Sequence, residues 1–411
     1  MLSFLTLLIT GILSLFYALF MVIDRAASML YASLFLCAVM GVCVGARADG
    51  QSFREVMGRY KWLWITMCSP LLAVIIYQLV TGDFRGRTFD LPSRLALFVF
   101  MLWAIMLVPL RALKLVKWAM ATGAIAAAIK IYVLTNGGVL RYGTDFIPII
   151  TFGQMSLLMG VFCAYSLAWE DKPSRLHIAV MLVALSAGLL SAYVSQSRGV
   201  WATVPVFMVL AFSLLRHVPR KIKLWLVALF VVALGLISMF SGIFKERVMA
   251  VQTDLQEYAS NTDVNTSLGL RLQLWKGSLV LFREHPLVGV GVENYPLALK
   301  DLAQRRIISE EASTYQHSHN EILFTMARLG IVGTLALLAV YFVPLGWFAL
   351  NLRHMDPGVR TPATMGTALV LGFFVLGLAD VVFLWWESFP FYAIGVALFV
   401  ACIDKRKRER V

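Results

Sequence analysis

Charged residues are scarce in this sequence. Only 14% of the 411 residues are Asp, Glu, Lys or Arg, whereas 60% are hydrophobic and the mean hydropathy is +0.79. Soluble domains are about 45–50% apolar, so this composition excludes an ordinary soluble protein. We predict an all-α polytopic membrane protein.

Acidic residues are fewer than basic ones, and the formal net charge is +13. Such an excess could indicate a nucleic-acid partner, but the Lys and Arg residues lie in short clusters between apolar runs, as topology signals do. The sequence has no basic helix and no aromatic-basic platform. We therefore expect no nucleic-acid binding.

Cysteine patterns typical of disulfide frameworks or zinc sites are missing. The five cysteines lie inside apolar runs and none has CxxC spacing, which indicates neither a disulfide framework nor a zinc site.

The apolar N-terminus also lacks a basic n-region and a small-residue cleavage site, so we interpret it as a retained first span.

Apolar runs of about 20 residues, the length that crosses the hydrocarbon core, predict about 12 transmembrane helices. They lie near residues 2–22, 26–45, 62–80, 95–110, 118–134, 148–168, 177–194, 200–215, 224–243, 322–350, 362–385 and 388–403. Two of these runs are short and the last two are barely separated, so ten or eleven spans is the alternative.

The basic residues of the short loops predict the orientation. The loops of one side and the C-terminal tail carry twenty Lys and Arg, against six in the short loops opposite. Positive loops stay inside, so we expect both termini in the cytoplasm. The predicted organisation is nine spans over 1–243, a periplasmic loop domain over 244–321, three spans over 322–403 and a basic tail over 404–411.

The long outer segment is too long to be a simple connector. Ser267 is positioned to cap a helix running to about Glu284, with an apolar stripe that would rest on the membrane surface or on the bundle. This stripe consists of Leu268, Leu272, Trp275, Leu279 and Phe282. The glycines of the segment 285–291 predict a tight, closely packed turn after this helix.

Two histidines stand where the tenth span begins, in the sequence TYQHSHNEILF (314–324). His317 and His319 are half of a metal site if carboxylates such as Glu310, Glu311 and Glu321 complete it, although zinc usually takes three or four protein ligands. A second interpretation is a structural histidine at the head of a helix. The third is a general base, because histidine accepts protons near neutral pH.

Several arginines lie on the predicted outer side, where basic residues are disfavoured. Arg198 stands in the very short loop SQSRGVW, where it either snorkels to lipid headgroups or binds a ligand. Arg271 belongs either to a solvated helix face or to a site, and Arg85 and Arg87 share a loop with two aspartates that could pair with them. A planar guanidinium matches a diphosphate well, since its donors are paired and its charge is permanent.

Together these residues predict an outward-facing site with several arginines, one or two histidines and no compact acidic motif such as DxD. Displacing a lipid diphosphate from a sugar requires neutralising the leaving group, by a metal or by fixed cations. Here the arginines would serve, and His319 is the candidate base for an acceptor hydroxyl.

The sequence resembles the O-antigen ligases and, more broadly, the O-antigen ligase/polymerase superfamily. Five stretches carry the resemblance: 197–201 (SRGVW) at the start of a span, Arg271 in a long outer loop, 286–291 (PLVGVG), 319–323 (HNEIL) and 328–333 (RLGIVG). They are distributed between residues 197 and 333, an interval of about a third of the chain.

The resemblance implies a glycosyltransferase of the GT-C type in the bacterial inner membrane, with its active site facing the periplasm. Such ligases move a finished O-antigen from undecaprenyl diphosphate to the lipid A-core oligosaccharide, with inversion and without a metal or cofactor. His319 resembles the catalytic histidine of the family, and Arg198 and Arg271 resemble its diphosphate-binding arginines. Arg85 and Arg87 are further candidates for diphosphate binding, and His317, Asn320 and Arg94 are secondary positions.

Other functions compete with this one. O-antigen polymerases and pilin-type oligosaccharyltransferases use similar lipid-linked donors. A transporter or flippase of lipid-linked glycans also suits twelve spans, but here the long loop does not divide two matched halves and no paired interrupted helices are found. Lys130, Arg328 and Asp380 are candidate intramembrane charges, which we explain by snorkelling at helix ends or by pairing inside the bundle.

Overall fold

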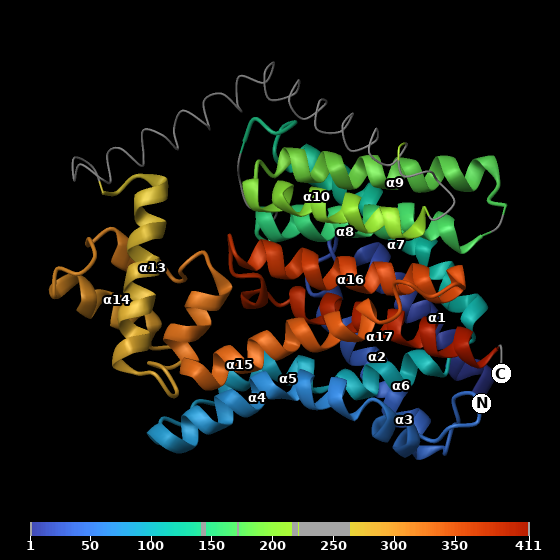
Figure 1. Ribbon diagram of the computed structural model, residues 1–411, viewed down its shortest axis with the longest axis horizontal. Helices are drawn as coiled ribbons and strands as arrows, with labels where there is room; N and C mark the ends of the chain where they lie inside the picture. Colours follow the sequence, from blue (N-terminus) through green and yellow to red (C-terminus); the bar gives the residue numbers. More distant parts are fainter. Residues whose placement is uncertain (1, 141–144, 171, 216–220, 222–263, 410–411) are drawn as a thin grey trace.

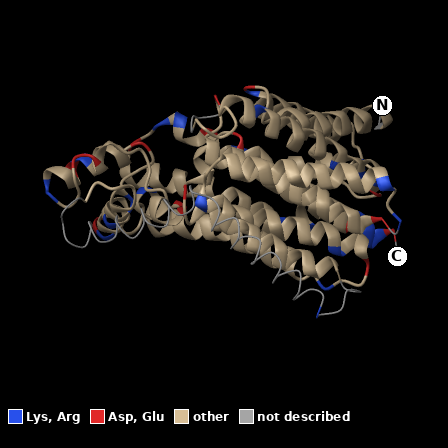
Figure 2. Ribbon diagram, turned by 90° about the horizontal axis from the view of Figure 1, so that it is seen from above, with Lys and Arg blue, Asp and Glu red and all other residues tan. Residues whose placement is uncertain are grey.

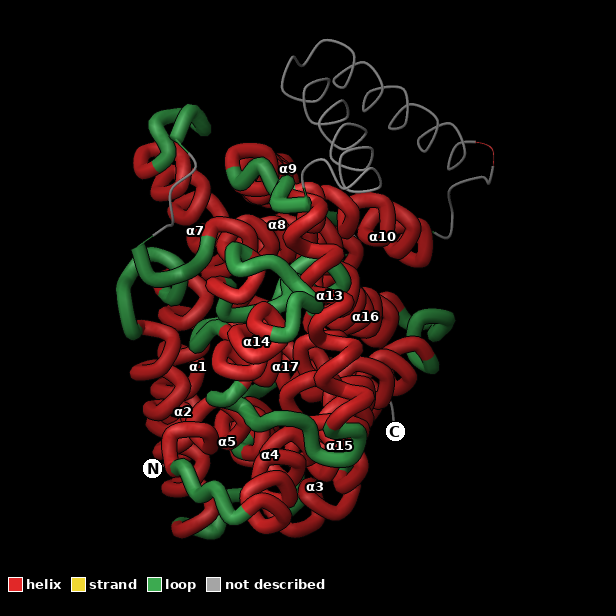
Figure 3. The backbone as a smooth tube through the Cα atoms, turned by 90° about the vertical axis from the view of Figure 1, so that its left-hand side faces the viewer, coloured by secondary structure: helices red, strands yellow, loops and turns green. Residues whose placement is uncertain are grey.

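The computed structural model describes residues 2–140, 145–170, 172–215, 221 and 264–409. These residues form helices and loops, and Figure 3 shows no strand among them. The membrane bundle begins with α1 (Leu2–Leu19), α2 (Ala26–Cys43), α3 (Phe53–Arg59), α4 (Lys61–Thr81), η1 (Gly86–Phe89), α5 (Asp90–Ala96), α6 (Phe98–Met106) and α7 (Leu110–Leu134).

The chain continues through α8 (Ile149–Ser166), η2 (Leu167–Trp169), α9 (Arg175–Val194) and α10 (Arg198–Leu214). Helices α13 (Ser267–Glu284) and α14 (Tyr295–Gln304), with η3 (Ala312–Thr314), form a lobe that we call the α13–α14 lobe (residues 264–320). The last elements are α15 (Glu321–Ala349), α16 (Pro357–Gly377), η4 (Val382–Leu384) and α17 (Ser388–Arg408).

Nine helical segments of the described residues are long and apolar enough to cross a membrane, and α1 and α10 are shorter apolar helices. Eleven of the twelve predicted spans therefore correspond to a helix. The remaining one, near 224–243, and the first part of the predicted loop, 244–263, lie outside the described residues. The prediction of an all-α polytopic membrane protein is confirmed.

Several predicted span boundaries are wrong by more than a turn, among them the start of the span near 118–134, which corresponds to Leu110–Leu134. The span near 95–110 corresponds to Gly86–Met106, which is built from η1, α5 and α6. The span near 362–385 ends at Gly377, because the backbone N–H groups of Val382 and Phe383 donate to the Glu321 side chain instead of continuing the helical ladder. The apolar run VVFLWW therefore lies in a loop that contains only the short η4.

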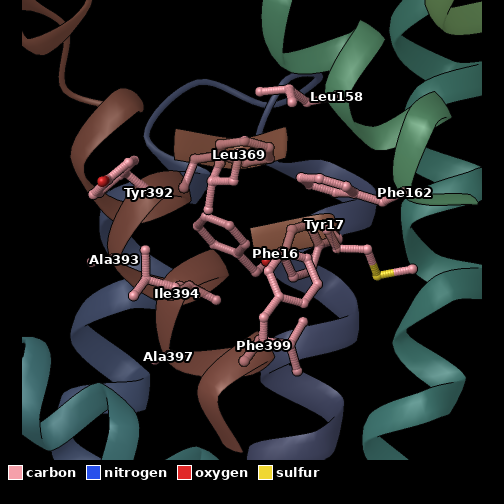
Figure 4. Packing of buried hydrophobic residues seen from close by; sticks show 14 of the residues in the cluster. Phe16, Tyr17, Leu158, Phe162, Leu369, Tyr392, Ala393, Ile394, Ala397 and Phe399 are labelled. Atoms are coloured by element: carbon pink, nitrogen blue, oxygen red, sulfur yellow. The ribbon is translucent and has the colours of Figure 1, made fainter. Parts of the chain in front are cut away.

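The core of the bundle lies where α1, α8, α16 and α17 meet. Phe16 and Tyr17 from α1 pack against the rings and aliphatic side chains of α8, α16 and α17, among them Phe162 and Phe399 (Figure 4). A Cβ on Gly160 of α8 would lie 2.7 Å from the carbonyl oxygen of Ala184 of α9. Such close backbone approach through small residues is typical of helix pairs in membranes.

The α13–α14 lobe stands at one end of the bundle, and both chain termini lie at the other end (Figure 1). Seen from above, the long middle part of the bundle carries few charged residues, as expected for a part that faces lipid (Figure 2). The lobe has a small core of its own, formed by residues such as Leu274, Tyr295 and Leu299 with Phe324 of α15.

One expectation about α13 needs correction. Its N-cap is Thr266, whose hydroxyl accepts the N–H of Gly269, and Ser267 is the first helical residue. The buried face contains Leu270, Leu274 and Leu281. The predicted stripe from Leu268 to Phe282 lies beside this buried face and is half-buried or exposed, and its contact with the membrane surface stays a prediction.

Glycines join the lobe to α15, as the sequence predicted for the turn after α13. The N–H of Gly291 donates to the Arg328 carbonyl oxygen at 2.9 Å, and the N–H of Ile331 to that of Pro286 at 2.8 Å. Gly330 has φ +59°, and a Cβ there would lie 2.4 Å from the Leu287 backbone. Only glycine fits this contact, so α15 is kinked where segment 286–291 lies against it.

Candidate functional site

The two predicted histidines lie at the N-terminus of α15, where the lobe meets the bundle. Asn320 is the N-cap, and its side-chain oxygen accepts the N–H of Leu323 at 3.0 Å. The preceding residue, His319, has the left-handed backbone conformation (φ 53°). The polar sequence before the apolar run therefore caps the helix. It also places His319 at the edge of the bundle.

His319 is paired with a carboxylate from another part of the chain. Its Nδ1 lies 3.3 Å from Oδ1 of Asp380, and the side chains are 21% and 7% exposed. Burial alone would raise the pKa of Asp380, but the His319 hydrogen bond and the two nearby imidazoles outweigh burial and lower it. Asp380 is thus a carboxylate held charged against a histidine.

The two residues after His319 hold the backbone on both sides of Asp380. The side-chain nitrogen of Asn320 donates to the carbonyl oxygen of Leu378 at 3.1 Å. The carboxylate of Glu321 accepts the N–H of Val382 at 2.6 Å and that of Phe383. Three consecutive residues of the chain, 319 to 321, therefore contact the segment 378–383 and fix Asp380 opposite the imidazole.

This pair has the geometry of an oriented general base. A carboxylate that accepts the proton on Nδ1 selects one tautomer, leaves Nε2 free to take a proton, and stabilises the imidazolium that results. The arrangement is therefore suited to removing a proton from a hydroxyl group.

His317 has a different role from His319. Its Nδ1 accepts the backbone N–H of His319 at 3.4 Å, and the two rings lie 4.4 Å apart between centroids. Burial, and then the neighbouring imidazole, lower the pKa of His317 to about 4. A neutral His317 that accepts a backbone hydrogen bond supports the loop.

The same groups are the only described residues that group as potential metal ligands. One ligand atom each of His317, His319 and Asp380 lies within 4.8 Å of the others. The carboxylate that joins the histidines is Asp380, and Glu321 is bound to backbone N–H groups. Because Nδ1 of each histidine already takes part in a hydrogen bond, metal binding would use Nε2 or rearrange the loop.

Arg271 is brought to this site by α13. One turn further along the helix, Nε1 of Trp275 donates to the carbonyl oxygen of Ser318, between the two histidines, at 3.0 Å. The positive charge of Arg271 contributes to lowering the pKa of His317. Arg271 is half-buried and forms no ion pair with a described residue.

Arg198 reaches the same region from the bundle. It is exposed at the first turn of α10, and a Cβ on the next residue, Gly199, would lie 2.9 Å from Cβ of Ala379. Ala379 precedes Asp380, so the start of α10 packs beside the segment that carries the carboxylate.

The structure does not gather the other predicted arginines around His319. Arg85 forms ion pairs with Asp83 at 2.8 Å and Glu293 at 3.0 Å. Arg94 donates to Ser28, pairs with an aspartate of its own helix, and lies 4.9 Å from the ring of Trp386. Arg87 is exposed and lines a cavity between α4, α5 and α15.

Sequence reasoning missed the role of Asp380. The predicted span ending near 385 included Asp380. A single carboxylate inside a span was explained by pairing with another charged residue of the bundle. The available signal was topological: the eleventh span returns to the side on which the tenth begins, so a carboxylate at its end lies at the level of His319.

The similarity to known proteins includes the part of the chain that contains this site. The sequence model of a family described as O-antigen ligase matches residues 179–338, which include Arg198, Arg271 and both histidines. An uncharacterized protein of Haemophilus influenzae is 24% identical over 272 residues, 65% of this chain and 67% of that protein. An O-antigen ligase of Escherichia coli K12 is 24% identical over 254 residues, 61% of this chain but only 57% of the ligase.

Proposed function

We propose that this chain, which belongs to the O-antigen ligase superfamily, transfers a finished O-antigen from undecaprenyl diphosphate to the lipid A-core oligosaccharide. The observation that carries the proposal is the pairing of His319 with Asp380 at the edge of the bundle, with Arg198 and Arg271 on adjoining elements.

In the proposed reaction a hydroxyl oxygen of the acceptor attacks the anomeric carbon of the glycan. His319 Nε2 takes the hydroxyl proton as the new C–O bond forms, and Asp380 stabilises the imidazolium. The bond between the anomeric carbon and the diphosphate oxygen breaks, and the diphosphate leaves with the electron pair. One displacement of this kind inverts the anomeric centre, so the proposed enzyme is an inverting glycosyltransferase. Its polytopic helical bundle agrees with the GT-C type.

The leaving group is neutralised by fixed cations in this proposal. Arg198 and Arg271 carry permanent charges and present paired N–H donors to the diphosphate oxygens. The reaction then needs neither a metal ion nor a cofactor. Arg85, held by two carboxylates, has a lesser part in donor binding than these two arginines.

We place the site on the periplasmic side of the bacterial inner membrane, with both termini in the cytoplasm. The excess of basic residues in the loops on the side of the termini supports this orientation, as does the position of the lobe at the opposite end of the bundle (Figure 1). A donor held by its lipid presents its diphosphate at the membrane surface, the level at which α15 begins.

The test is transfer by the purified chain in the presence of excess chelator. Undecaprenyl-diphosphate-linked glycan and lipid A-core are supplied, and glycan joined to the acceptor is measured. Product with chelator supports a metal-independent ligase. Product only after a divalent metal is restored would make His317, His319 and Asp380 ligands. No product in either case would favour a polymerase, another transferase of the superfamily, or a transporter.

A further inference from the structure

A cavity of about 240 Å³ lies between α4, α5, α15 and the segment 383–389. Its walls are mainly apolar and its polar groups include two arginines, Arg87 and Arg328. This combination of an apolar wall and cationic groups is characteristic of a site for an amphiphile with an anionic headgroup.

The apolar wall continues along α15. Gly333, Leu337 and Val340 all line the cavity, and at 1.5 Å per residue they extend over about 10 Å of helix. Pro70 and Val74 of α4 line it as well. Because α4 and α15 are both candidate spans, the cavity extends into the depth of the membrane, where only apolar chains are readily accommodated.

The two arginines are not held in ion pairs by described residues, although the charges of Glu321 and Glu293 act on Arg328. Nε of Arg328 donates to the carbonyl oxygen of Val292 at 3.1 Å, and its guanidinium lies 4.3 Å from the Phe324 ring centroid. Neither Arg328 nor Arg87 forms an ion pair within the described part of the chain. Arg87 is exposed, but a partly desolvated cation such as Arg328 is costly where no ion pair compensates it, and a bound anion would reduce that cost.

The carboxylates that line the same cavity are already engaged. Glu293 pairs with Arg85 at 3.0 Å, and Glu321 accepts the backbone N–H groups of Val382 and Phe383. The lining therefore has two arginines available to an anion, whereas each carboxylate has a donor of its own.

The cavity is distinct from the region that contains Arg198 and Arg271. Neither of these arginines lines it, nor do His319 and Asp380, while Glu321 and Phe383 belong both to its wall and to the contact that holds the Asp380 segment. The two pairs of arginines thus belong to different parts of the molecule. A transfer between two lipid-anchored substrates needs two such sites.

We propose that this cavity binds the phosphate-bearing lipid anchor of the acceptor. Arg87 and Arg328 contact a phosphate with paired N–H donors, and one apolar chain lies along α15. The assignment to the acceptor rests on the proposed ligase function, whereas binding of a phosphorylated lipid rests only on the cavity and its arginines.

The test measures lipid binding without turnover, using the full chain in detergent and native mass spectrometry. The probes are lipid A-core, undecaprenyl diphosphate without glycan, and inorganic phosphate. Losing a charge-assisted hydrogen bond costs enough that we expect Arg328→Gln and Arg87→Gln each to raise the Kd for lipid A-core about tenfold. Binding of undecaprenyl diphosphate should stay unchanged, and Arg271→Gln should show the reverse selectivity.

Two further variants guard against indirect effects. Arg283→Gln removes the same charge from an exposed position of α13 and should leave both affinities unchanged. Leu91→Trp keeps both arginines but fills the cavity from a half-buried position, so it should weaken lipid A-core binding even if Arg328→Gln unfolds the protein.

Three outcomes would overturn the inference: loss of undecaprenyl diphosphate binding instead of lipid A-core binding, no change in either, or displacement of lipid A-core by inorganic phosphate at equal concentration. The proposed function fails separately. If the chain transfers no glycan but lipid A-core still binds through Arg87 and Arg328, the phosphorylated-lipid site stands and its role for an acceptor does not.

Discussion

The two ends of the bundle differ in how several of their charged residues are engaged. At the end with the termini, basic side chains of α17 and α3 are paired with carboxylates of α17 itself and of the neighbouring loops. The pairs are Lys405 with Asp49 at 2.6 Å, Arg406 with Asp356 at 2.8 Å, Arg408 with Asp404 at 2.6 Å and Arg59 with Asp404 at 3.2 Å. Charge at this end ties α17 to the loops around it.

At the end with the lobe, several cations have no such partner. Arg271, Arg87 and Arg328 form no ion pair within the described residues, and the buried carboxylate Asp380 is paired with a titratable histidine. Charges that a protein neutralises internally serve its structure, whereas charges left without partners at a partly buried surface are available to a ligand. The comparison supports the proposal that substrates bind at the end with the lobe.

The largest effect is expected from His319→Ala. Removing a general base costs about 10²–10⁴ in rate, so transfer should fall below detection while the affinity for undecaprenyl diphosphate stays within a factor of about two. Product formation and equilibrium donor binding are measured in parallel. His285→Ala, at an exposed histidine that ends α13, is the matched control, and full activity of His319→Ala would falsify the general-base assignment.

Asp380→Asn should cost less, about 10²-fold in kcat, because the imidazole remains but loses the charge that stabilises its protonated form. Glu321→Gln should cost about tenfold, since a neutral amide oxygen accepts the Val382 and Phe383 N–H groups more weakly. Both should leave the KM for the donor unchanged. An equal loss in kcat/KM and in donor affinity would show instead that the segment 378–383 shapes the donor site.

Arg271→Ala should weaken both donor binding and turnover, by about tenfold or more each, because a charge-assisted contact to the diphosphate persists into the transition state. Arg271→Lys retains the charge without the planar fork and should recover part of the loss. The measurement is steady-state kinetics at varied donor concentration. If Arg271→Ala changes neither parameter, Arg271 belongs to a solvated helix face.

Acidification should destabilise the lobe end before the end with the termini. The folded pKa of His317 is about 4, so between its ordinary pKa of about 6.5 and pH 4 the unfolded state binds more protons and stability falls as pH falls. The lowered pKa of Asp380 acts only below about pH 4. Thermal unfolding in detergent at pH 7 and pH 4.5 is compared, and His317→Gln should reduce the difference.

The smallest effect on activity is expected at the end with the termini. Asp404 accepts hydrogen bonds from Arg59, Tyr60 and Arg408, so Asp404→Asn should lower the free energy of unfolding by about 1–2 kcal/mol. Transfer by the folded fraction should be unchanged. A loss of kcat comparable to that of Glu321→Gln would mean that the two ends are coupled, and the comparison between them would fail.

Most of the fold could be predicted from the sequence because membrane spans depend on local composition. Each apolar run of the described residues forms a helix near its predicted position. One error falls where a tertiary contact overrides the apolar run: α16 ends at Gly377 because Glu321 accepts the next backbone N–H groups.

The candidate site was predictable only in part. His317 and His319 were identifiable because their polar context interrupts an apolar sequence, and Arg198 because it stands in a very short loop. The interaction partners of these residues could not be identified from the sequence, since a contact such as that between His319 and Asp380 joins residues 61 positions apart. The different settings of Arg85 and Arg87 also depend on where the lobe places Glu293.

Hydropathy and the distribution of basic residues were enough to predict a helical membrane protein with a polar outer segment, because burial in lipid acts on each span separately. Which carboxylate holds His319, which arginines remain unpaired and where an amphipathic cavity opens are set by the packing of α15 against α4, α16 and the lobe. These features depend on distances between residues remote in sequence, and the tertiary structure alone determines those distances.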